Sequence, residues 1–259
     1  MKKRGQITIF IIVGLILVFS MFIILYLNKN KIGDLDVLQS SDIKPIEYYV
    51  DLCVKSSASD ALYLLGVQGG YTTTPDLYFE SAYAKIAYWY YKGRDTSPAI
   101  EEMEQELSSY VNRALPECIE SLNVFSDMGF EFEFGEINTK TKINENNVEF
   151  NIDYPITIKK GDSKTEIKEF YRNFPVRLGH MHSIAKEIVG KEIEDPDWID
   201  MTYLVGQDVN FQIYPYDENI IIYSLLDNRS EVEGDLEFVL LFANLFNESK
   251  ESSLEEDEE

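Results

Sequence analysis

A long uncharged segment near the start of the chain limits what the protein can fold into. Residues 1–6 contain three basic side chains, and Ile7–Leu27 follows directly as twenty-one residues without a charge. An α-helix rises about 1.5 Å per residue, so this segment is long enough to cross a hydrocarbon core of about 30 Å. The sequence therefore predicts a basic segment at 1–6, a single transmembrane helix at 7–27, and the lipid bilayer as the partner of that helix.

A secretory signal peptide is the alternative for this segment, because it also places basic residues before an apolar stretch. Its apolar part is usually about 7 to 15 residues long and ends at a small-x-small cleavage site. Here the apolar run is longer and ends in Tyr26-Leu27-Asn28-Lys29, which contains no such site. We therefore expect an anchor that is retained.

The side of the membrane on which the remaining chain lies is predicted from several weak signals. The basic residues before and after 7–27 are nearly balanced and favour neither orientation strongly. Two Asn-x-Ser sequons place candidate glycosylation sites at Asn228 and Asn247, and the chain has two cysteines. Together these features predict a single-pass protein of the cell membrane, with a cytoplasmic N-terminus and an extracytoplasmic C-terminal domain.

The first residues resemble a known processing signal. Lys3-Arg4-Gly5-Gln6, followed directly by an apolar helix, is similar to the class III signal of archaeal type IV pilins and archaellins, which is cut between Gly and Gln. The resemblance covers about the first 27 residues and implies cleavage after Gly5, with Gln6 as the new N-terminus. Phe10 stands where these pilins carry Glu, which implies a minor or non-assembling pilin-like protein. A plain signal anchor is the alternative.

The charge of the chain is strongly asymmetric. The formal net charge is −23, and residues 1–32 carry five basic and no acidic side chains, so residues 33–259 carry −28. Such a surface repels nucleic acid and anionic lipid, and nucleic acid is therefore excluded as a partner. A solvated acidic surface is the ordinary explanation of this charge.

Composition separates a folded region from flexible flanks. The chain is 45% hydrophobic and 13% aromatic, which is sufficient for a packed core. Residues 28–43 are polar and are predicted to be a linker. Residues 248–259 are predicted to be a disordered acidic tail, because their like charges repel and they offer little apolar surface. The folded domain is expected at 44–247, with a candidate sub-boundary near 191–198.

Two long helices are predicted at the start of the folded domain. The first begins near Pro45 after a cap at Asp42, carries apolar residues at three- and four-residue spacing, and ends at Gly66 as a left-handed cap. The second opens at Ser97-Pro98, with Ser as the cap and Pro at the first helical position, and continues to Gly129.

The apolar period then changes to two, which is typical of half-buried antiparallel strands. This pattern covers Phe130–Pro175, and helical spacing returns over Arg177–Gly190. Further strands are predicted near 209–213, 220–226 and 236–245, with Asp227–Ser230 as a loop. The predicted fold class is α+β, in which a single N-terminal transmembrane helix precedes an ectodomain of long helices and antiparallel β-sheet.

The two cysteines lie on the apolar stripes of the two predicted helices. Cys53 belongs to the first helix and Cys118 to the second, which is the arrangement that one cross-helix disulfide needs. A location outside the cytoplasm favours the bond over two buried thiols. The sequence therefore predicts a Cys53–Cys118 disulfide.

The search for motifs that carry chemistry is mostly negative. The sequence contains no glycine-rich phosphate loop, no Gly-x-Ser-x-Gly and no His-Glu-x-x-His. His180 and His182 are the only histidines, and on a helix their rings would point about 200° apart around the axis. Paired carboxylates cannot be singled out among forty-six acidic residues. We therefore expect no catalytic, metal-binding or cofactor-binding residues, and no enzyme activity.

Two classes of function fit these features. The first is a membrane-anchored structural or interaction protein of the cell surface, which includes a pilin-like protein, with protein partners or self-association at that surface. The second is an anchored extracytoplasmic ligand-binding or sensing domain, for which the aromatic strand at Tyr83–Tyr91 is the candidate face. A surface hydrolase is a more distant alternative.

The resemblance at the N-terminus leads to a direct test. If the class III signal is functional, the native protein begins at Gln6 and keeps the whole apolar segment that follows. Mass spectrometry of the N-terminal peptide from the native host checks this expectation. A native chain that begins at Met1 would leave a plain signal anchor as the interpretation.

Overall fold

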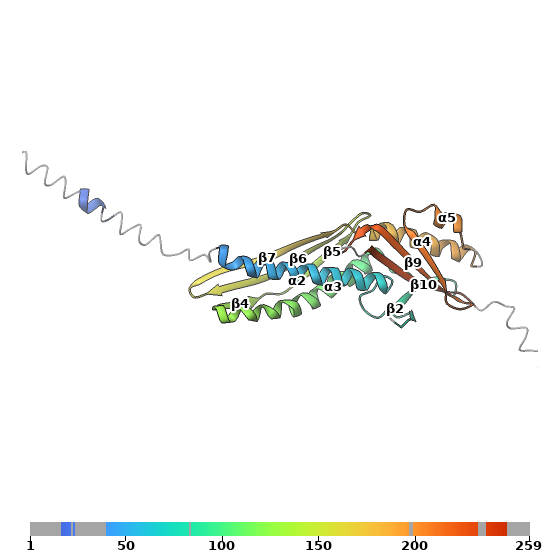
Figure 1. Cartoon of the computed structure of the whole chain (residues 1–259), viewed down its shortest axis with the longest axis horizontal. Coiled ribbons are helices and arrows are strands. Elements are labelled where there is room, and N and C mark those ends of the chain that lie inside the picture. The colour runs from blue at the N-terminus through green and yellow to red at the C-terminus, as the bar shows by residue number, and fades with distance from the viewer. Residues whose placement is uncertain are drawn as a thin grey trace, which may run out of the picture.

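The computed structural model describes residues 17–21, 23, 40–82, 84–196, 199–232 and 237–247. The described residues between 40 and 247 form one elongated α+β molecule, in which two long helices lie side by side along the length (Figure 1). The start of the first of these helices and the end of the last strand lie at opposite ends of the molecule (Figure 1).

The elements of the described residues follow in chain order. The helices are α2 (Ser40–Val67), α3 (Ile100–Ile119), the 3-10 helix η1 (Glu120–Met128), α4 (Leu178–Glu194) and α5 (Met201–Val205). The strands are β1 (Tyr78–Glu80), β2 (Lys85–Tyr91), β3 (Arg94–Asp95), β4 (Phe130–Phe134), β5 (Asn138–Ile143), β6 (Val148–Lys160), β7 (Ser163–Phe174), β8 (Asn210–Pro215), β9 (Ile220–Glu231) and β10 (Glu237–Leu245).

The predicted fold class needs correction in its transmembrane helix. Within the residues that the structure describes, no helix is both long and apolar enough to cross a membrane. The predicted span at 7–27 contributes only residues 17–21 and 23 to this part of the chain. The predicted segments at 1–6 and 248–259, and residues 28–39 of the predicted linker, lie outside it. The architecture that the structure supports is an α+β fold with one antiparallel and one mixed sheet.

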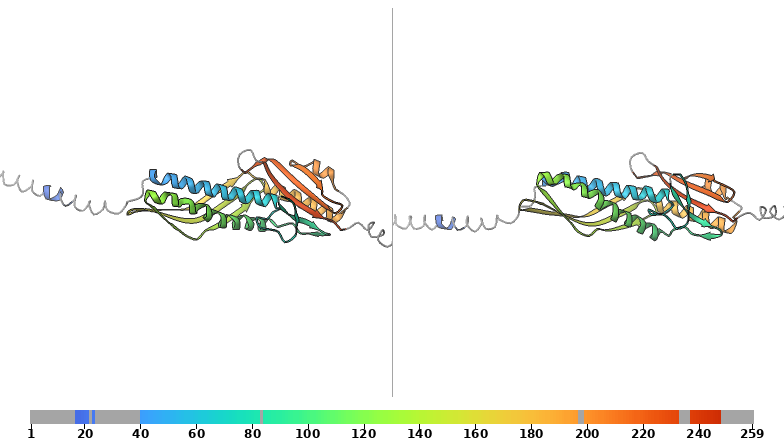
Figure 2. Two further views of the ribbon diagram at one scale, coloured as in Figure 1. Left: turned by 60° about the horizontal axis from the view of Figure 1, so that its bottom comes forward. Right: turned by 90° about the horizontal axis from the view of Figure 1, so that it is seen from below.

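The four-stranded sheet is built around the long strand β6. Strand β6 pairs with β7 on one edge, with a register shift between Asp153 and Ile156, while β4 and β5 share the other edge, and every pair is antiparallel. Alternate β6 side chains, including Phe150, Ile152 and Ile156, are buried on the face that α2 and α3 cover (Figure 2). The opposite face carries the polar residues of the period-two pattern and remains exposed.

A polar stripe of α3 closes the free edge of this sheet. Glu104, Ser108 and Asn112 are four residues apart and therefore lie on one side of the helix. Their side-chain oxygens accept hydrogen bonds from the backbone N–H groups of Ile143, Thr141 and Thr139 in β5, at 2.9, 3.1 and 2.9 Å. The helix thus satisfies the donors that an edge strand otherwise leaves unpaired.

The six-stranded sheet has the order β1-β2-β10-β9-β8, and β3 also pairs with β2. Strands β2 and β10 run parallel, which differs from the purely antiparallel sheet predicted from the sequence. One face packs against α4 through large buried side chains, among them Trp89, Tyr223 and Phe242. Stacked rings join these three residues, with centroids 4.9 Å apart for Trp89 and Phe242 and 5.0 Å for Tyr223 and Phe242.

The aromatic strand predicted at Tyr83–Tyr91 is part of the core. Strand β2 occupies Lys85–Tyr91, and its residues from Ile86 to Tyr90 are all buried. Trp89 is fully buried and donates through Nε1 to the carbonyl oxygen of Gly69 at 2.8 Å. This strand therefore cannot present the open aromatic face that the ligand-binding interpretation assigned to it.

Several predicted element ends are also wrong. Helix α2 includes residues 40–43 of the predicted linker and contains Pro45, so Asp42 is not its cap. Helix α3 begins at Ile100, and the carboxylate of Glu102 accepts from the backbone N–H of Ala99 at 2.9 Å. Ser97 is therefore not the cap of α3. Its backbone N–H instead donates to the carboxylate of Asp95 at 3.0 Å.

Gly66 has a different role from the predicted cap. Helix α2 continues to Val67, and the left-handed residues are Gly69 and Gly70, with φ angles of 72° and 100°. A side chain at position 66 would place its Cβ 2.2 Å from the carbonyl oxygen of Val239. Gly66 therefore allows α2 to approach β10 closely, while the two following glycines end the helix.

The predicted loop at Asp227–Ser230 is also wrong, because these residues continue strand β9. Residues 191–194 of the candidate sub-boundary belong to α4, and one contiguous core contains buried residues of both sheets and of α2, α3 and α4. The two sheets are therefore packed into a single folded body.

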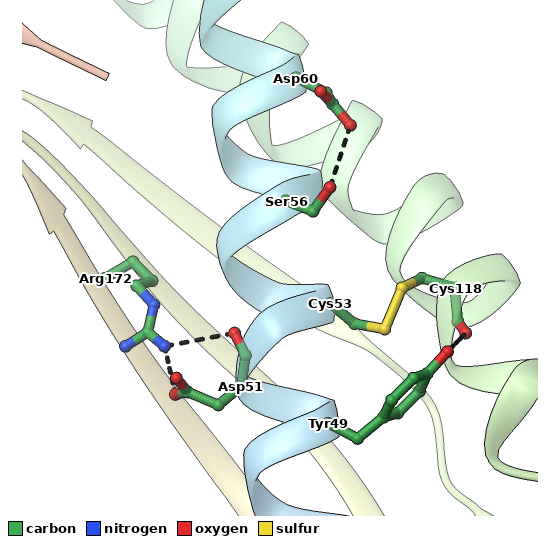
Figure 3. Close-up of a disulfide and its surroundings, with 7 residues drawn as sticks. All are labelled: Tyr49, Asp51, Cys53, Ser56, Asp60, Cys118 and Arg172. Carbon is green, nitrogen blue, oxygen red and sulfur yellow. Dashed lines mark hydrogen bonds and ion pairs between the residues drawn. A yellow bond between two sulfur atoms is a disulfide. The ribbon is translucent and has the colours of Figure 1, made fainter. Parts of the chain in front are cut away.

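The pair α2 and α3 is held together by apolar stripes and one covalent bond. Ser57, Ala58 and Ala61 are small buried residues of α2 that permit close helix packing. Figure 3 shows the disulfide between Cys53 and Cys118, whose Cα atoms are 5.7 Å apart. Beside it, the hydroxyl of Tyr49 donates to the carbonyl oxygen of Cys118 at 3.1 Å (Figure 3).

This disulfide has a measurable expected effect on stability. Cys118 lies 65 positions after Cys53, and closing a loop of that length in the unfolded chain contributes about 4 kcal/mol in the chain-entropy model. We expect reduction to lower the free energy of unfolding by an amount of this order, measured by denaturant titration with and without reductant.

The variant carrying both Cys53→Ala and Cys118→Ala is the control, because reductant has no disulfide to break in it. Thiol alkylation of the unreduced, denatured wild type should label neither cysteine. Labelling of both would contradict the predicted bond in the native protein.

Candidate functional site

A buried ion network joins the start of α4 to strand β9. The guanidinium of Arg177 donates from Nε and Nη2 to the two carboxylate oxygens of Asp227, both at 2.8 Å, and from Nη1 to Asp208 at 3.0 Å. Asp227 is fully buried, and its carboxylate also accepts from the hydroxyl of Ser230. This bidentate geometry is the strongest form of a charge-assisted hydrogen bond.

The charges in this network are matched by their neighbours. Burial opposes ionisation of Asp227, but the hydrogen bonds from Arg177 and Ser230 hold its pKa below the usual value. The imidazole of His180 and the guanidinium of Arg177 lower the pKa of Asp208, whose Oδ1 lies 2.7 Å from Nε2 of His180. Arg229 also donates to the carboxylate of Asp208. With its partners engaged, this network is suited to holding α4 against β9.

A second buried polar cluster lies near the other end of α4. Glu192 is 2% exposed, and its carboxylate accepts hydrogen bonds from the hydroxyl of Tyr223 and the side-chain amide of Asn244. Asn244 in turn accepts from the backbone N–H of Tyr90 at 3.1 Å. Burial raises the pKa of Glu192 to about 7, although the two hydrogen bonds oppose this shift. The carboxyl group therefore titrates near neutral pH inside the core.

The two histidines lie on different sides of α4, as their spacing on a helix predicts. His180 contacts Asp208, whereas His182 is buried, with Nε2 2.8 Å from the carbonyl oxygen of Pro98. Burial lowers the pKa of His182. In the part of the chain that the structure describes, no group of three or more His, Cys, Asp or Glu residues is arranged to hold a metal ion.

The other sequence-predicted sites are scattered. Asn228 lies in β9 and Asn247 follows β10, and both are exposed. The predicted processing site at Gly5 and Gln6 lies outside the described residues. Cys53 and Cys118 lie in the helix pair that covers the four-stranded sheet. The structure thus brings together only the two cysteines among these residues.

A polar hollow lies on the exposed face of the four-stranded sheet. We call it the sheet basin; its volume is about 460 Å³. Six exposed side chains from three strands surround it: Asn138 and Lys140 of β5, Asn151 and Asp153 of β6, and Glu169 and Tyr171 of β7.

Strand register places these side chains in two adjacent rows. Lys140 pairs with Asn151, which pairs with Tyr171 across the next interface. The second row consists of Asn138, Asp153 and Glu169 in the same order. Directly opposed residues on one face of an antiparallel pair lie about 5 Å apart at Cβ, so each row forms a continuous polar strip.

Five of the six basin side chains have no protein partner among the described residues. The side chains of Asn138, Lys140, Asn151, Asp153 and Tyr171 make no hydrogen bond or ion pair with any residue that the structure describes, while Glu169 lies 3.8 Å from its neighbour Lys168. The phenol of Tyr171 is 52% exposed. These groups remain available to a ligand from solvent.

The chain was then compared with known proteins. No family model, curated protein or solved structure matches it.

Sequence reasoning missed all three polar clusters. Arg177, Asp208 and Asp227 come from separate segments, and no spacing signal links them before the strands are placed. Glu192, Tyr223 and Asn244 are joined only by packing of α4 on the sheet. The period-two pattern over Phe130–Pro175 predicted antiparallel strands, but the register that aligns the polar residues of β5, β6 and β7 could not be read from it.

The buried carboxyl group of Glu192 predicts a pH dependence of stability. Its folded pKa lies above the ordinary value of 4.5, so its stabilising contribution is complete below about pH 4.5 and is lost as the pH rises through about 7. We expect Glu192→Gln, which resembles the protonated form, to raise the free energy of unfolding by about 3 kcal/mol at pH 8 and to change it little at pH 4.

Denaturant titrations across this pH range measure the effect. Glu194→Gln is the matched control, because Glu194 is exposed at the end of the same helix and should show no such pH-dependent gain. Equal behaviour of the two variants at pH 8 would contradict the assignment of the titrating group.

Proposed function

We propose that this protein is a non-catalytic structural or interaction protein of the cell surface, with residues 40–247 outside the cytoplasm. The observation that carries the proposal is the disulfide between Cys53 and Cys118. Disulfides form and persist in oxidising compartments and are rare in the cytosol of most organisms. The bond joins the two long helices, which lie side by side.

The shape of the molecule supports a spacing or presenting role. Helix α2 has 28 residues, which corresponds to about 42 Å, and α3 runs beside it. The start of α2 and the end of β10 lie at opposite ends (Figure 1). A rod of this kind holds surfaces at one end away from whatever is attached at the other.

The start of the chain supports the same location. Its resemblance to a class III signal would bring the protein into the export route of pilin-like proteins, with Gln6 as the mature N-terminus. The exposed acceptors Asn228 and Asn247 would then be available for glycosylation. Phe10 in place of the usual Glu favours a minor or non-assembling member rather than the main subunit of a filament.

Protease treatment of intact native cells tests the location. We expect the folded domain to be cut while the cells remain intact, and a cytoplasmic control protein should remain whole until lysis. Full protection of the domain in intact cells, followed by digestion after lysis, would reverse the proposal.

A further inference from the structure

The sheet basin has a stable floor. Strand β6 lies in the middle of the sheet and pairs with β5 and β7 at the residues that line the basin. On the opposite edge of β5, the stripe of α3 that contains Ser108 and Asn112 fixes the backbone of Thr141 and Thr139. Backbone on both sides of Lys140 is therefore held in place before any ligand arrives.

In a neighbouring row of the same sheet face, the polar side chains have protein partners. Lys142, Glu149 and Asn173 lie in one row next to the basin. Lys142 pairs with Glu104 at 3.0 Å, Glu149 accepts from Asn147 at 3.0 Å, and Asn147 donates to Asn173 at 2.8 Å. The polar side chains of this row thus bind Glu104 or Asn147, whereas in the two rows of the basin only Glu169 has a protein partner, its neighbour Lys168 at 3.8 Å.

The unbound groups are of mixed kinds. The amides of Asn138 and Asn151 both donate and accept, the carboxylates of Asp153 and Glu169 only accept, and the ammonium of Lys140 only donates. A ligand that matches all three must carry many groups that can donate and accept, and hydroxyl groups have this property. The exposed ring of Tyr171 adds an apolar surface on which the C–H face of a ring can lie.

Charge narrows the class of ligand further. The basin carries two carboxylates and one ammonium, and residues 33–259 carry −28, so phosphates, sulfates and acidic polymers are repelled. Asp153 and Glu169 are directly opposed across two strands, an arrangement that destabilises a sheet unless something else engages the carboxylates. Neutral hydroxyl groups can donate to both without adding charge.

We propose that the sheet basin is a binding site for a neutral saccharide. The ring of Tyr171 supports one face of a sugar unit, while Asn138, Asn151 and the carboxylates of Asp153 and Glu169 bind its hydroxyl groups. The volume of about 460 Å³ lies within the range of about 300 to 1,000 Å³ of small-molecule sites. The site is a shallow face, so its dissociation constants should lie at about the millimolar to micromolar level.

The test uses the purified full-length chain, so the location of the protein plays no part in the result. Neutral and anionic oligosaccharides are presented on an array, without sugar-based detergent, and maltotriose, cellotriose and chitotriose are then titrated against the immobilised chain. We expect binding of at least one neutral saccharide, and no preference for sulfated or sialylated ones.

Variants connect binding to the basin. Tyr171→Ala should weaken the binding about tenfold or more, and Asn151→Ala provides a second variant with little effect on packing. Tyr214→Ala is the matched control, because Tyr214 is a similarly exposed tyrosine, 50% exposed, on the other sheet. Unchanged thermal unfolding verifies that each variant is folded.

Three outcomes would overturn the proposal. The first is that no neutral saccharide binds at about 10 mM, because this concentration exceeds the weakest dissociation constant expected for such a site. Binding that is unaffected by both basin variants is the second, since it would place the saccharide elsewhere. Binding that requires added Ca²⁺ is the third, because it would make the basin a cation site.

Discussion

The hydrogen bonds that the edge of β5 donates to side chains of α3 hold the architecture together. Without them, β5 would present unpaired backbone donors to solvent and to other chains. Glu104, Ser108 and Asn112 supply acceptors at four-residue spacing on the helix, and β5 offers donors at alternate residues. Each acceptor therefore faces one donor along the strand. A slip of β5 by one residue would move all three N–H groups away from their acceptors on α3. The helix thus helps to fix the register of the sheet. The alignment of polar rows on the far face follows from that register.

The parts of the fold that depend on local pattern could be predicted from the sequence. The apolar stripes of α2 and α3, the alternation along β6 and the turn that separates β6 from β7 all came from residues within a short window. Element ends were less predictable. Gly66 is the residue type usual at a helix C-terminal cap, but contact with β10 determines its role. That contact joins residues far apart in the chain. The transmembrane helix, inferred from length and lack of charge alone, has no counterpart in the described residues.

The buried polar clusters show why the sites were harder to predict than the fold. Arg177 precedes α4 and Glu192 lies near its end, and each is bonded to β9 or β10. An apolar face alone permits a helix to slide or rotate on a sheet at small cost, because the hydrophobic effect is not directional. Polar partners at both ends of α4 allow one orientation only. Which residues become these polar partners depends on how α4 packs on the sheet, so no spacing in the sequence predicts them.

The parallel pairing of β2 with β10 has a consequence for how the protein is made. Tyr90 and Asn244 are in contact although 154 positions separate them. During synthesis or translocation the aromatic strand therefore emerges long before the strand that completes its sheet. Until β10 has been made, Trp89 and Tyr90 lack the neighbouring strand that covers one side of β2. Contacts between residues so far apart in the chain also form slowly. The aromatic strand of the nascent chain thus stays without its parallel partner until residues 237–245 have been made, and apolar surface exposed in this way favours aggregation.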